Sequence, residues 1–221
     1  MKQDYCHISV ILDESGSMNS ILNDTIGGFN AFLKTQKDTP GEATFSLTTF
    51  NTASHIAYSF KDIQDVEELT KVTYRPGGMT ALYDAIGQTI SGCGQKLAMI
   101  DSDQRPEKVI IVILTDGEEN SSREFSFTKI QEMTKEQSDK YNWEFVFLGA
   151  NLDAEAVGSS LGIKAGNSMT FAANSVGVGA TFTSMGTNLS SYRSSSADTV
   201  LSSNYKFFTP DDKVNQKQAG V

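Results

Sequence analysis

Three short segments of the chain collect small oxygen-bearing side chains with glycines between them. The segments are Asp13–Met18 (DESGSM), Pro76–Thr80 (PGGMT) and Thr115–Asn120 (TDGEEN). Hydroxyl and carboxylate oxygens are ligands that Mg²⁺ prefers, and this ion takes them in a near-octahedral arrangement while keeping several of its waters. The three segments together predict a site for a divalent cation, with Mg²⁺ as the expected ion and Mn²⁺ or Ca²⁺ as alternatives.

The expected metal-site residues of these segments are Asp13, Ser15, Ser17, Thr80 and Asp116. Ser15 and Ser17 alternate within one turn, so both hydroxyls can point at the same place, and Thr80 supplies a third neutral oxygen. We expect the two aspartates to hold metal-bound waters and to orient the hydroxyls from behind. Neutral direct ligands leave the cation electrophilic, so a carboxylate of another molecule is the expected sixth ligand.

Each of these residues, taken singly, also fits a plainer role. Aspartate and serine commonly cap helices, and Gly77 and Gly78 fit an ordinary turn. Five oxygen-bearing residues on loops that converge favour metal binding over five separate caps.

Polar and charged side chains are expected to surround the site. The predicted rim, where a partner would make further contacts, comprises Asn51, Arg75, Tyr83, Glu118 and Asn120. Each of them is equally compatible with a solvated loop position. Glu14, Glu118 and Glu119 bring negative charge close to the site, and that charge works against an acidic partner.

The site requires a sheet whose strand ends bring the three loops together. Apolar runs predict three buried parallel strands over His7–Leu12, Val109–Leu114 and Phe145–Leu148. Runs without polar alternation are typical of strands that helices cover on both faces. The alternating segments Ala43–Phe50 and Ser54–Phe60 predict a hairpin at one edge. In such sheets ligands bind beyond the carboxyl ends of the strands.

Helical periodicity fills the gaps between these strands. Apolar residues at helical spacing predict helices over residues 22–33, 80–97, 127–133 and 154–161. Pro40 and Gly41 end the first of them. The order is strand, helix, hairpin, helix, strand, helix, strand, helix, and such alternation predicts a mostly parallel α/β sheet.

The C-terminal third carries no charged residue between Ala165 and Tyr192. Its apolar residues nevertheless keep a helical spacing over Val178–Tyr192. We expect one more helix there, held by tertiary packing in spite of its weak propensity; a surface covered by a partner is the alternative. The expected organisation is a single domain over residues 1–192, followed by a loop and a flexible tail over residues 193–221.

The three loops and their order resemble the von Willebrand factor A family. Its pattern is Asp-x-Ser-x-Ser after a first apolar strand, a Gly-Gly-x-Thr loop that opens a helix, and an apolar strand that ends in Thr-Asp-Gly. Here the matching segments read DESGSM, GGMTALYDAIG and VILTDG, within residues 5–190. The layout is similar to that of stand-alone bacterial and phage members of the family.

The resemblance implies a Rossmann-like, doubly wound, mostly parallel six-stranded sheet with one antiparallel edge strand and helices on both faces. It also implies a metal-ion-dependent adhesion site (MIDAS), built here from Asp13, Ser15, Ser17, Thr80 and Asp116. In the family, the bound cation recognises an acidic group on a partner.

The charge and composition of the chain argue against several classes of function. The formal net charge is −9, from 18 Lys plus Arg against 27 Asp plus Glu, and no basic cluster occurs. Binding to nucleic acid or to anionic membranes is therefore not expected. No apolar run is long enough to span a bilayer, and the N-terminus does not read as a signal peptide. Cys6 and Cys93 are expected to be reduced and buried, which favours a cytoplasmic location.

The predicted function is a cation-dependent protein-binding module that captures an Asp or Glu carboxylate of another protein, without enzymatic activity. The alternative is a metal-dependent hydrolase that acts on phosphate esters at the same site. Ser15 stands where a phosphatase with an aspartyl nucleophile has its second aspartate. His7 and His55, the two histidines of the chain, are expected to be structural and not to serve as catalytic bases.

Overall fold

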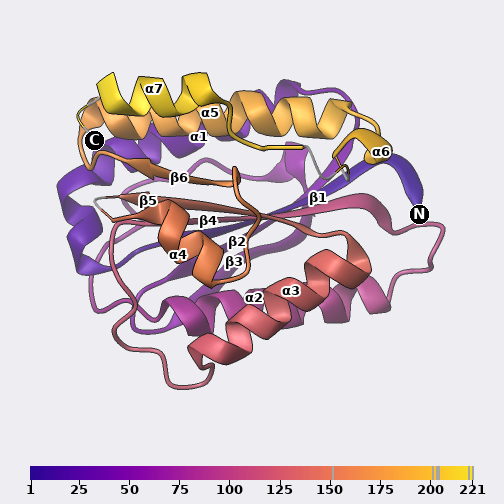
Figure 1. The fold of residues 1–221 in the computed structure, drawn as a ribbon, viewed down its shortest axis with the longest axis horizontal. Helices are drawn as coiled ribbons and strands as arrows, with labels where there is room; N and C mark the ends of the chain where they lie inside the picture. The colour runs from indigo at the N-terminus through magenta and orange to yellow at the C-terminus, as the bar shows by residue number, and fades with distance from the viewer. Residues whose placement is uncertain (151, 201, 203–204, 219, 221) are drawn as a thin grey trace.

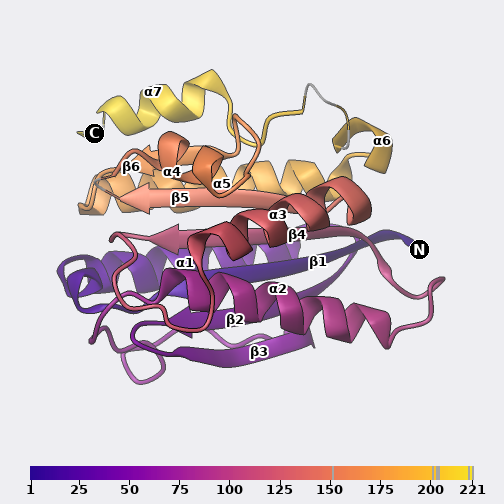
Figure 2. The same ribbon diagram turned by 60° about the horizontal axis from the view of Figure 1, so that its bottom comes forward.

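The sheet has six strands in the order β3-β2-β1-β4-β5-β6. The computed structural model describes residues 1–150, 152–200, 202, 205–218 and 220. The strands are β1 (Lys2–Asp13), β2 (Glu42–Phe50), β3 (Ser54–Asp62), β4 (Pro106–Thr115), β5 (Glu144–Ala150) and β6 (Ser168–Phe171). Neighbouring strands are parallel except for β2 and β3, which form an antiparallel hairpin at one edge. Figure 2 shows β1 in the middle of the sheet, between β2 and β4.

Helices cover both faces of this sheet. They are α1 (Leu22–Asp38), α2 (Leu82–Ala98), α3 (Phe127–Tyr141), α4 (Ala154–Ser160), α5 (Ser175–Ser194), α6 (Ala197–Val200) and α7 (Pro210–Gln218), with 3-10 turns η1 (Gly16–Ile21) and η2 (Ile63–Asp65). In Figure 1, α1, α5 and α7 lie on one side of the sheet and α2, α3 and α4 on the other. The chain therefore forms the doubly wound, three-layer sandwich that the sequence predicts.

Alternate residues of the central strands enter two separate cores. On β4, Val112 belongs to the core under α1 and α5, and its neighbour Ile113 belongs to the core under α2 and α3. Both are almost completely buried. Because both faces of β4 are buried, all of its central residues are apolar. The prediction of a buried parallel strand from this unbroken apolar run is confirmed.

The structure adds β6, which the apolar pattern did not predict. This strand has four residues and begins with a buried serine, Ser168. It pairs in parallel with β5, from Phe147 opposite Ser168 to Ala150 opposite Phe171. Pairing with a neighbour and burial, and not its own pattern, make this segment a strand.

The C-terminal segment differs from the expected loop and flexible tail over residues 193–221. Residues 201, 203–204, 219 and 221 lie outside the described part, but the rest of the segment contains α6 and α7. Phe207 and Phe208 are buried in the core under α1 and α5. Their backbone N–H groups donate to Asn167 Oδ1 and to the Gly166 carbonyl. The segment is held because burying two phenylalanines outweighs the entropy of ordering a short polar stretch.

Helix α5, which carries no charged residue before Arg193, packs inside the molecule. Its buried face includes Phe182, Met185 and Leu189, and the side chain of Gln216 on α7 donates to the Gly177 carbonyl and to Thr181 Oγ1 of α5. Packing within the chain therefore explains why this stretch lacks charge, as the first of the two sequence interpretations predicts.

A buried lysine holds the C-terminal end of α5. Lys108 Nζ, at the start of β4, donates to the carbonyls of Tyr192, Arg193 and Ser195. Lys108 is only 3% exposed. A cation at this position satisfies carbonyls that have no partner within the helix and complements the helix dipole. It fixes the end of α5 to the sheet.

Both cysteines are free and buried, as the sequence predicts, and they belong to different cores. His7 is fully buried in β1, where its ring stacks on Phe60 at 3.6 Å between centroids. In the described part of the chain, no helix combines the length and the apolarity needed to cross a bilayer.

Candidate functional site

The three oxygen-rich loops meet at the carboxyl-end edge of the sheet. β1 ends at Asp13, β4 ends at Thr115, and α2 begins two residues after Thr80. Backbone hydrogen bonds join the loops: Gly77 N–H donates to the Glu14 carbonyl at 2.9 Å, and Asn120 N–H donates to the Thr80 carbonyl at 3.0 Å. The main chain itself thus brings the predicted metal-site residues to one place.

Hydrogen bonds connect the side chains of the first and third loops. Asp13 Oδ1 accepts the Ser15 N–H at 2.7 Å. The Ser15 and Ser17 hydroxyls lie 3.1 Å apart, and Ser17 Oγ donates to Asp116 Oδ1 at 2.6 Å. The run Asp13, Ser15, Ser17, Asp116 is therefore continuous, and it spans the two loops that follow the adjacent strands β1 and β4.

Thr80 reaches the same place from the second loop. A Cβ built on Gly117 would lie 3.5 Å from Thr80 Oγ1 and 3.9 Å from Ser17 Oγ, so both hydroxyls lie around one point next to Gly117. Thr80 Oγ1 makes no hydrogen bond to another described residue, whereas the Thr80 backbone N–H donates to Asn120 Oδ1. All five predicted metal-site residues are thus brought together, each with an oxygen at the site.

The two aspartates of the site carry negative charge that no nearby cationic side chain of the described residues balances. Asp13 is completely buried and Asp116 is partly buried, and neither forms an ion pair with a described residue. Burial raises the pKa of Asp13, and the nearby charge of Asp116 raises it further. Burial likewise raises the pKa of Asp116. Buried carboxylates in proteins are normally paired with a cation or bound to a metal, so a divalent cation fits here.

The donor set also fits a hard cation. Among the described residues, no group of three or more His, Cys, Asp or Glu side chains is arranged to hold a metal. The hydroxyls of Ser15, Ser17 and Thr80 supply neutral oxygens in their place. Such a set suits Mg²⁺ or Mn²⁺, which accept oxygen ligands and retain water, and it lacks the nitrogen and sulfur ligands of a structural zinc site.

Two residues that the sequence reasoning missed hold Asp13 in position. Thr115 Oγ1 donates to Asp13 Oδ2 at 2.6 Å, and the Tyr74 hydroxyl, itself buried, donates to the Asp13 carbonyl. Thr115 was visible in the motif VILTDG, directly before Asp116. Tyr74 lies in an irregular loop and shows no sequence pattern that would have identified it.

The predicted rim residues divide into those that build the loops and those that face solvent. The side-chain oxygen of Asn120 binds Thr80, and the backbone carbonyl of Asn51 accepts the N–H of Ala81, so both support the site. Arg75 and Glu118 are exposed, and Tyr83 is partly buried.

Two of the three glutamates near the site have carboxylates that accept backbone N–H groups. The carboxylate of Glu119 accepts the N–H of Tyr83 at 3.0 Å and the N–H of Ser122 at 2.6 Å. The carboxylate of Glu14 accepts the N–H of Arg75. Glu118, in contrast, is exposed. Of the three glutamates, Glu118 therefore presents its charge most openly to a partner.

A second carboxylate fixes the loop after Asp116 to α2. Asp84, in the first turn of α2, accepts the N–H groups of Glu124 and Phe125 on Oδ1 and that of Arg123 on Oδ2, all at 2.8–2.9 Å. The sequence signal was an acidic residue in the first turn of a predicted helix, which ordinarily indicates a favourable interaction with the helix dipole. Here Asp84 ties the loop that carries Asp116 to the helix that follows Thr80.

Gly78 is required by the geometry of the second loop. Its φ is +82°, and a Cβ there would lie 2.8 Å from Thr52 Oγ1. Only glycine takes this backbone conformation without strain. Gly78 is therefore a necessity of the turn that delivers the Thr80 hydroxyl, whereas a Cβ at Gly77 would meet no heavy atom within 4 Å.

Comparison with known proteins identifies the fold. Residues 7–182 match the family model of the von Willebrand factor type A domain. No curated protein matches the sequence. Three solved structures share the fold: the ArnB paralog VWA2 from Sulfolobus acidocaldarius (18% identity, TM-score 0.53), the pilus adhesin SpaC from Lactobacillus rhamnosus GG in its open conformation (14%, 0.64), and proximal thread matrix protein 1 from the mussel byssus with a zinc-occupied MIDAS motif (16%, 0.51).

The alignments cover most of this chain and less than half of each of these proteins. They span 81%, 87% and 75% of this chain, and 44%, 30% and 41% of the respective relatives. The likeness concerns the domain and its fold.

Proposed function

The chain belongs to the von Willebrand factor type A domain family, and on that premise we propose that it is a divalent-cation-dependent protein-binding module. Its cation is held by Asp13, Ser15, Ser17, Thr80 and Asp116, and captures an acidic side chain of another protein. Mg²⁺ is the proposed ion, with Mn²⁺ or Ca²⁺ as alternatives, and the proposed location is the cytoplasm.

The observation that carries this proposal is the unequal exposure of the site's oxygens. Asp13 and Ser15 are 0% and 2% exposed, whereas Ser17 is exposed and Asp116 is partly exposed. The Asp13 charge is therefore deep, and the neutral Ser17 hydroxyl lies toward solvent beside the partly exposed Asp116. A cation held in this way supplies Lewis acidity toward solvent, where a carboxylate of a partner is a suitable ligand. The zinc-occupied MIDAS motif of the mussel byssus protein supports a divalent ion at such a site.

Two exposed rim residues, Arg75 and Glu118, have opposite effects on the binding of an acidic partner. Arg75 is exposed and its guanidinium forms no ion pair with a described residue, so it offers a second contact to an acidic partner. The exposed carboxylate of Glu118 disfavours partners with several acidic groups close together. We therefore propose a partner that presents a single Asp or Glu carboxylate.

Metal binding is tested by thermal unfolding of the metal-stripped protein with added Mg²⁺, Mn²⁺ or Ca²⁺. An ion at about a hundred times its dissociation constant stabilises the folded state by about 2.7 kcal/mol, or roughly 5–10 °C in Tm for a domain of this size. The double variant Asp13→Ala, Ser15→Ala is expected to lose this shift. Ser20→Ala is the matched control, because Ser20 Oγ bonds only the Ser17 carbonyl at 3.1 Å and lies outside the donor set.

Two outcomes would contradict the metal site. If no ion shifts the Tm of the wild type, the loops are caps and turns. If the shift persists in the double variant, the ion binds elsewhere.

Carboxylate capture is tested with acetate as the probe and acetamide as its neutral counterpart. With protein in excess over Mn²⁺, a carboxylate that reaches the bound ion has its methyl proton signal broadened by the paramagnetic metal. We expect broadening of acetate and much less of acetamide, and loss of the difference in the double variant. Equal broadening of the two probes would leave the metal site in place and refute its role in recognising acidic groups.

A further inference from the structure

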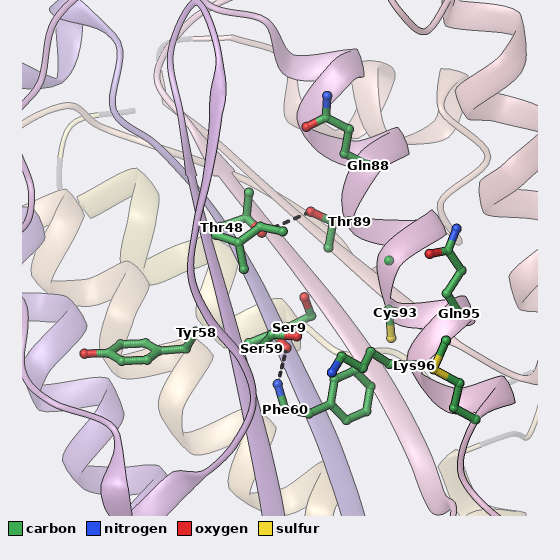
Figure 3. A pocket seen from close by; sticks show the side chains of 14 residues that line it. Ser9, Thr48, Tyr58, Ser59, Phe60, Gln88, Thr89, Cys93, Gln95 and Lys96 are labelled. Atoms are coloured by element: carbon green, nitrogen blue, oxygen red, sulfur yellow. Dashed lines mark hydrogen bonds between the residues drawn. The ribbon is translucent and has the colours of Figure 1, made fainter.

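A pocket opens between α2 and the edge hairpin, on the face of the sheet opposite α1 and α5 (Figure 3). Its volume is about 320 Å³, which equals roughly ten water molecules at about 30 Å³ each and lies at the small end of the range of ligand pockets. β1, β2 and β3 form one wall and the second half of α2 forms the other. The oxygens of the candidate metal site are not among its lining residues.

The pocket exists because α2 does not cover the edge strand. Ile56 on β3 is 61% exposed and Met99, just after α2, is 82% exposed, although both are large apolar residues. Phe60 and Cys93 complete an apolar lining between them. An apolar ligand bound here would remove this surface from water, which favours binding.

One hydroxyl in the pocket has no partner. Ser9, in the central strand β1, lines the pocket and is 0% exposed, and its Oγ makes no hydrogen bond to the protein. Buried hydroxyls are nearly always hydrogen-bonded, and leaving one unpaired is unfavourable. Because Ser9 has no exposed surface, this hydroxyl lies beneath the pocket wall, and the recognition of a ligand falls to the residues above it.

The charge of the pocket is set by one residue. Lys96 is the single charged side chain among the lining residues, and it forms no ion pair with a described residue. Figure 3 shows its amine directed from α2 toward the Phe60 side of the pocket. At the other end, the amide of Gln88 donates to the Glu124 carboxylate at 2.6 Å. An anionic group of a ligand therefore belongs at the Lys96 end.

We propose that this pocket is a binding site for a small amphipathic monocarboxylate. Its apolar chain lies between Phe60, Ile56 and α2, and its carboxylate pairs with the Lys96 ammonium. The site is separate from the metal site and does not depend on a cation. A medium-chain fatty acid anion has the required size and chemistry.

The test uses decanoate as the probe, in the presence of EDTA, with binding followed by calorimetry and by ligand-detected NMR. Chelation separates this site from the metal site, where a carboxylate is also expected to bind. Gly92 and Gly94 of α2 provide a matched pair, since neither has a heavy atom within 4 Å of a Cβ position but only Gly92 lines the pocket. Gly92→Leu is expected to abolish decanoate binding, and Gly94→Leu to retain it.

The contribution of the carboxylate is measured with Lys96→Gln and with decan-1-ol as the uncharged probe. We expect this variant to weaken decanoate binding about threefold, the size of an exposed ion pair, and to leave the affinity for decan-1-ol unchanged. Lys96 is exposed, so the variant is expected to fold normally.

Three results would overturn the proposal. The wild type fails to bind decanoate in EDTA, Gly92→Leu binds it as well as Gly94→Leu does, or Lys96→Gln changes the affinity for both probes equally. Failure of the metal proposal leaves these measurements unaffected, because none of them uses a cation.

Discussion

Replacing Gly28 by alanine tests how closely α5 packs on α1. A Cβ at Gly28 would lie 2.2 Å from Phe182 Cδ2 and 2.8 Å from Phe182 Cγ. The ring is 3% exposed and belongs to the core, so it has little room to move away. The adjacent Gly27 has no heavy atom within 4 Å of its Cβ position. The two glycines of one helix therefore form a matched pair.

The magnitude follows from two opposing effects. Alanine in place of glycine within a helix contributes about 1 kcal/mol of stability, and Gly27→Ala should gain all of it. Gly28→Ala gains the same amount but forces the Phe182 ring to shift, and overpacking of this kind costs roughly 1–3 kcal/mol. The two variants should therefore differ by about 1–3 kcal/mol, with Gly28→Ala the less stable.

The assay is urea unfolding followed by circular dichroism, with the slope m compared among variants to verify that the transition is unchanged in extent. Phe182→Leu provides a second check, because removing the ring should be less harmful in the Gly28→Ala background than in the wild type. Equal stability of Gly27→Ala and Gly28→Ala would refute the packing described here.

Four further predictions concern individual polar residues and the enzymatic alternative. Burial lowers the pKa of His7 to about 3, below its ordinary 6.5, so the unfolded chain binds a proton that the folded protein excludes. Stability should fall as the pH drops from about 6.5 to 3, by about 1.4 kcal/mol per pH unit more than in His7→Gln, as measured by urea unfolding across this range. Lys108→Met leaves the carbonyls of Tyr192, Arg193 and the C-cap Ser195 without their donor and should cost about 2–4 kcal/mol in unfolding free energy, whereas the exposed Lys129→Met should cost almost nothing. Asp84→Asn keeps one acceptor oxygen of two, and hydrogen exchange at Arg123 should accelerate more than at Phe125. A metal-loaded wild type is expected not to hydrolyse p-nitrophenyl phosphate; turnover that Asp13→Ala abolishes would establish the hydrolase instead.

The convergence of the candidate metal-site residues could be predicted because their chemistry is local. The Asp-x-Ser-x-Ser turn and the Thr-Asp-Gly turn each directly follow a strand, so predicting β1 and β4 from their apolar runs also placed Asp13 and Asp116 at one edge. The support for these residues was harder to see. Tyr74 bonds the Asp13 carbonyl from 61 positions away, and only tertiary structure brings it there.

The start of α7 has a sequence signal that could have predicted this helix. Thr209, Pro210 and Asp212 form a helix start in which Thr209 Oγ1 accepts the Asp212 N–H and Asp212 Oδ2 accepts the Thr209 N–H. Thr-Pro-x-Asp is a capping pattern with proline at the first helical position. The polar composition of residues 210–218 favoured a tail, whereas this capping pattern and the adjacent Phe207 and Phe208 indicate a helix that docks.

The position of β1 in the sheet has a consequence for how the chain is made. Its partner β2 begins about 40 residues later in the sequence, but its other partner, β4, begins about 100 residues later. At a synthesis rate of roughly 5–20 residues per second, one edge of an apolar strand stays unpaired for roughly 5–20 s on the ribosome. An exposed strand edge is a template for pairing with other chains. Nascent chains that have not yet reached residue 115 are thus the species in greatest need of a chaperone.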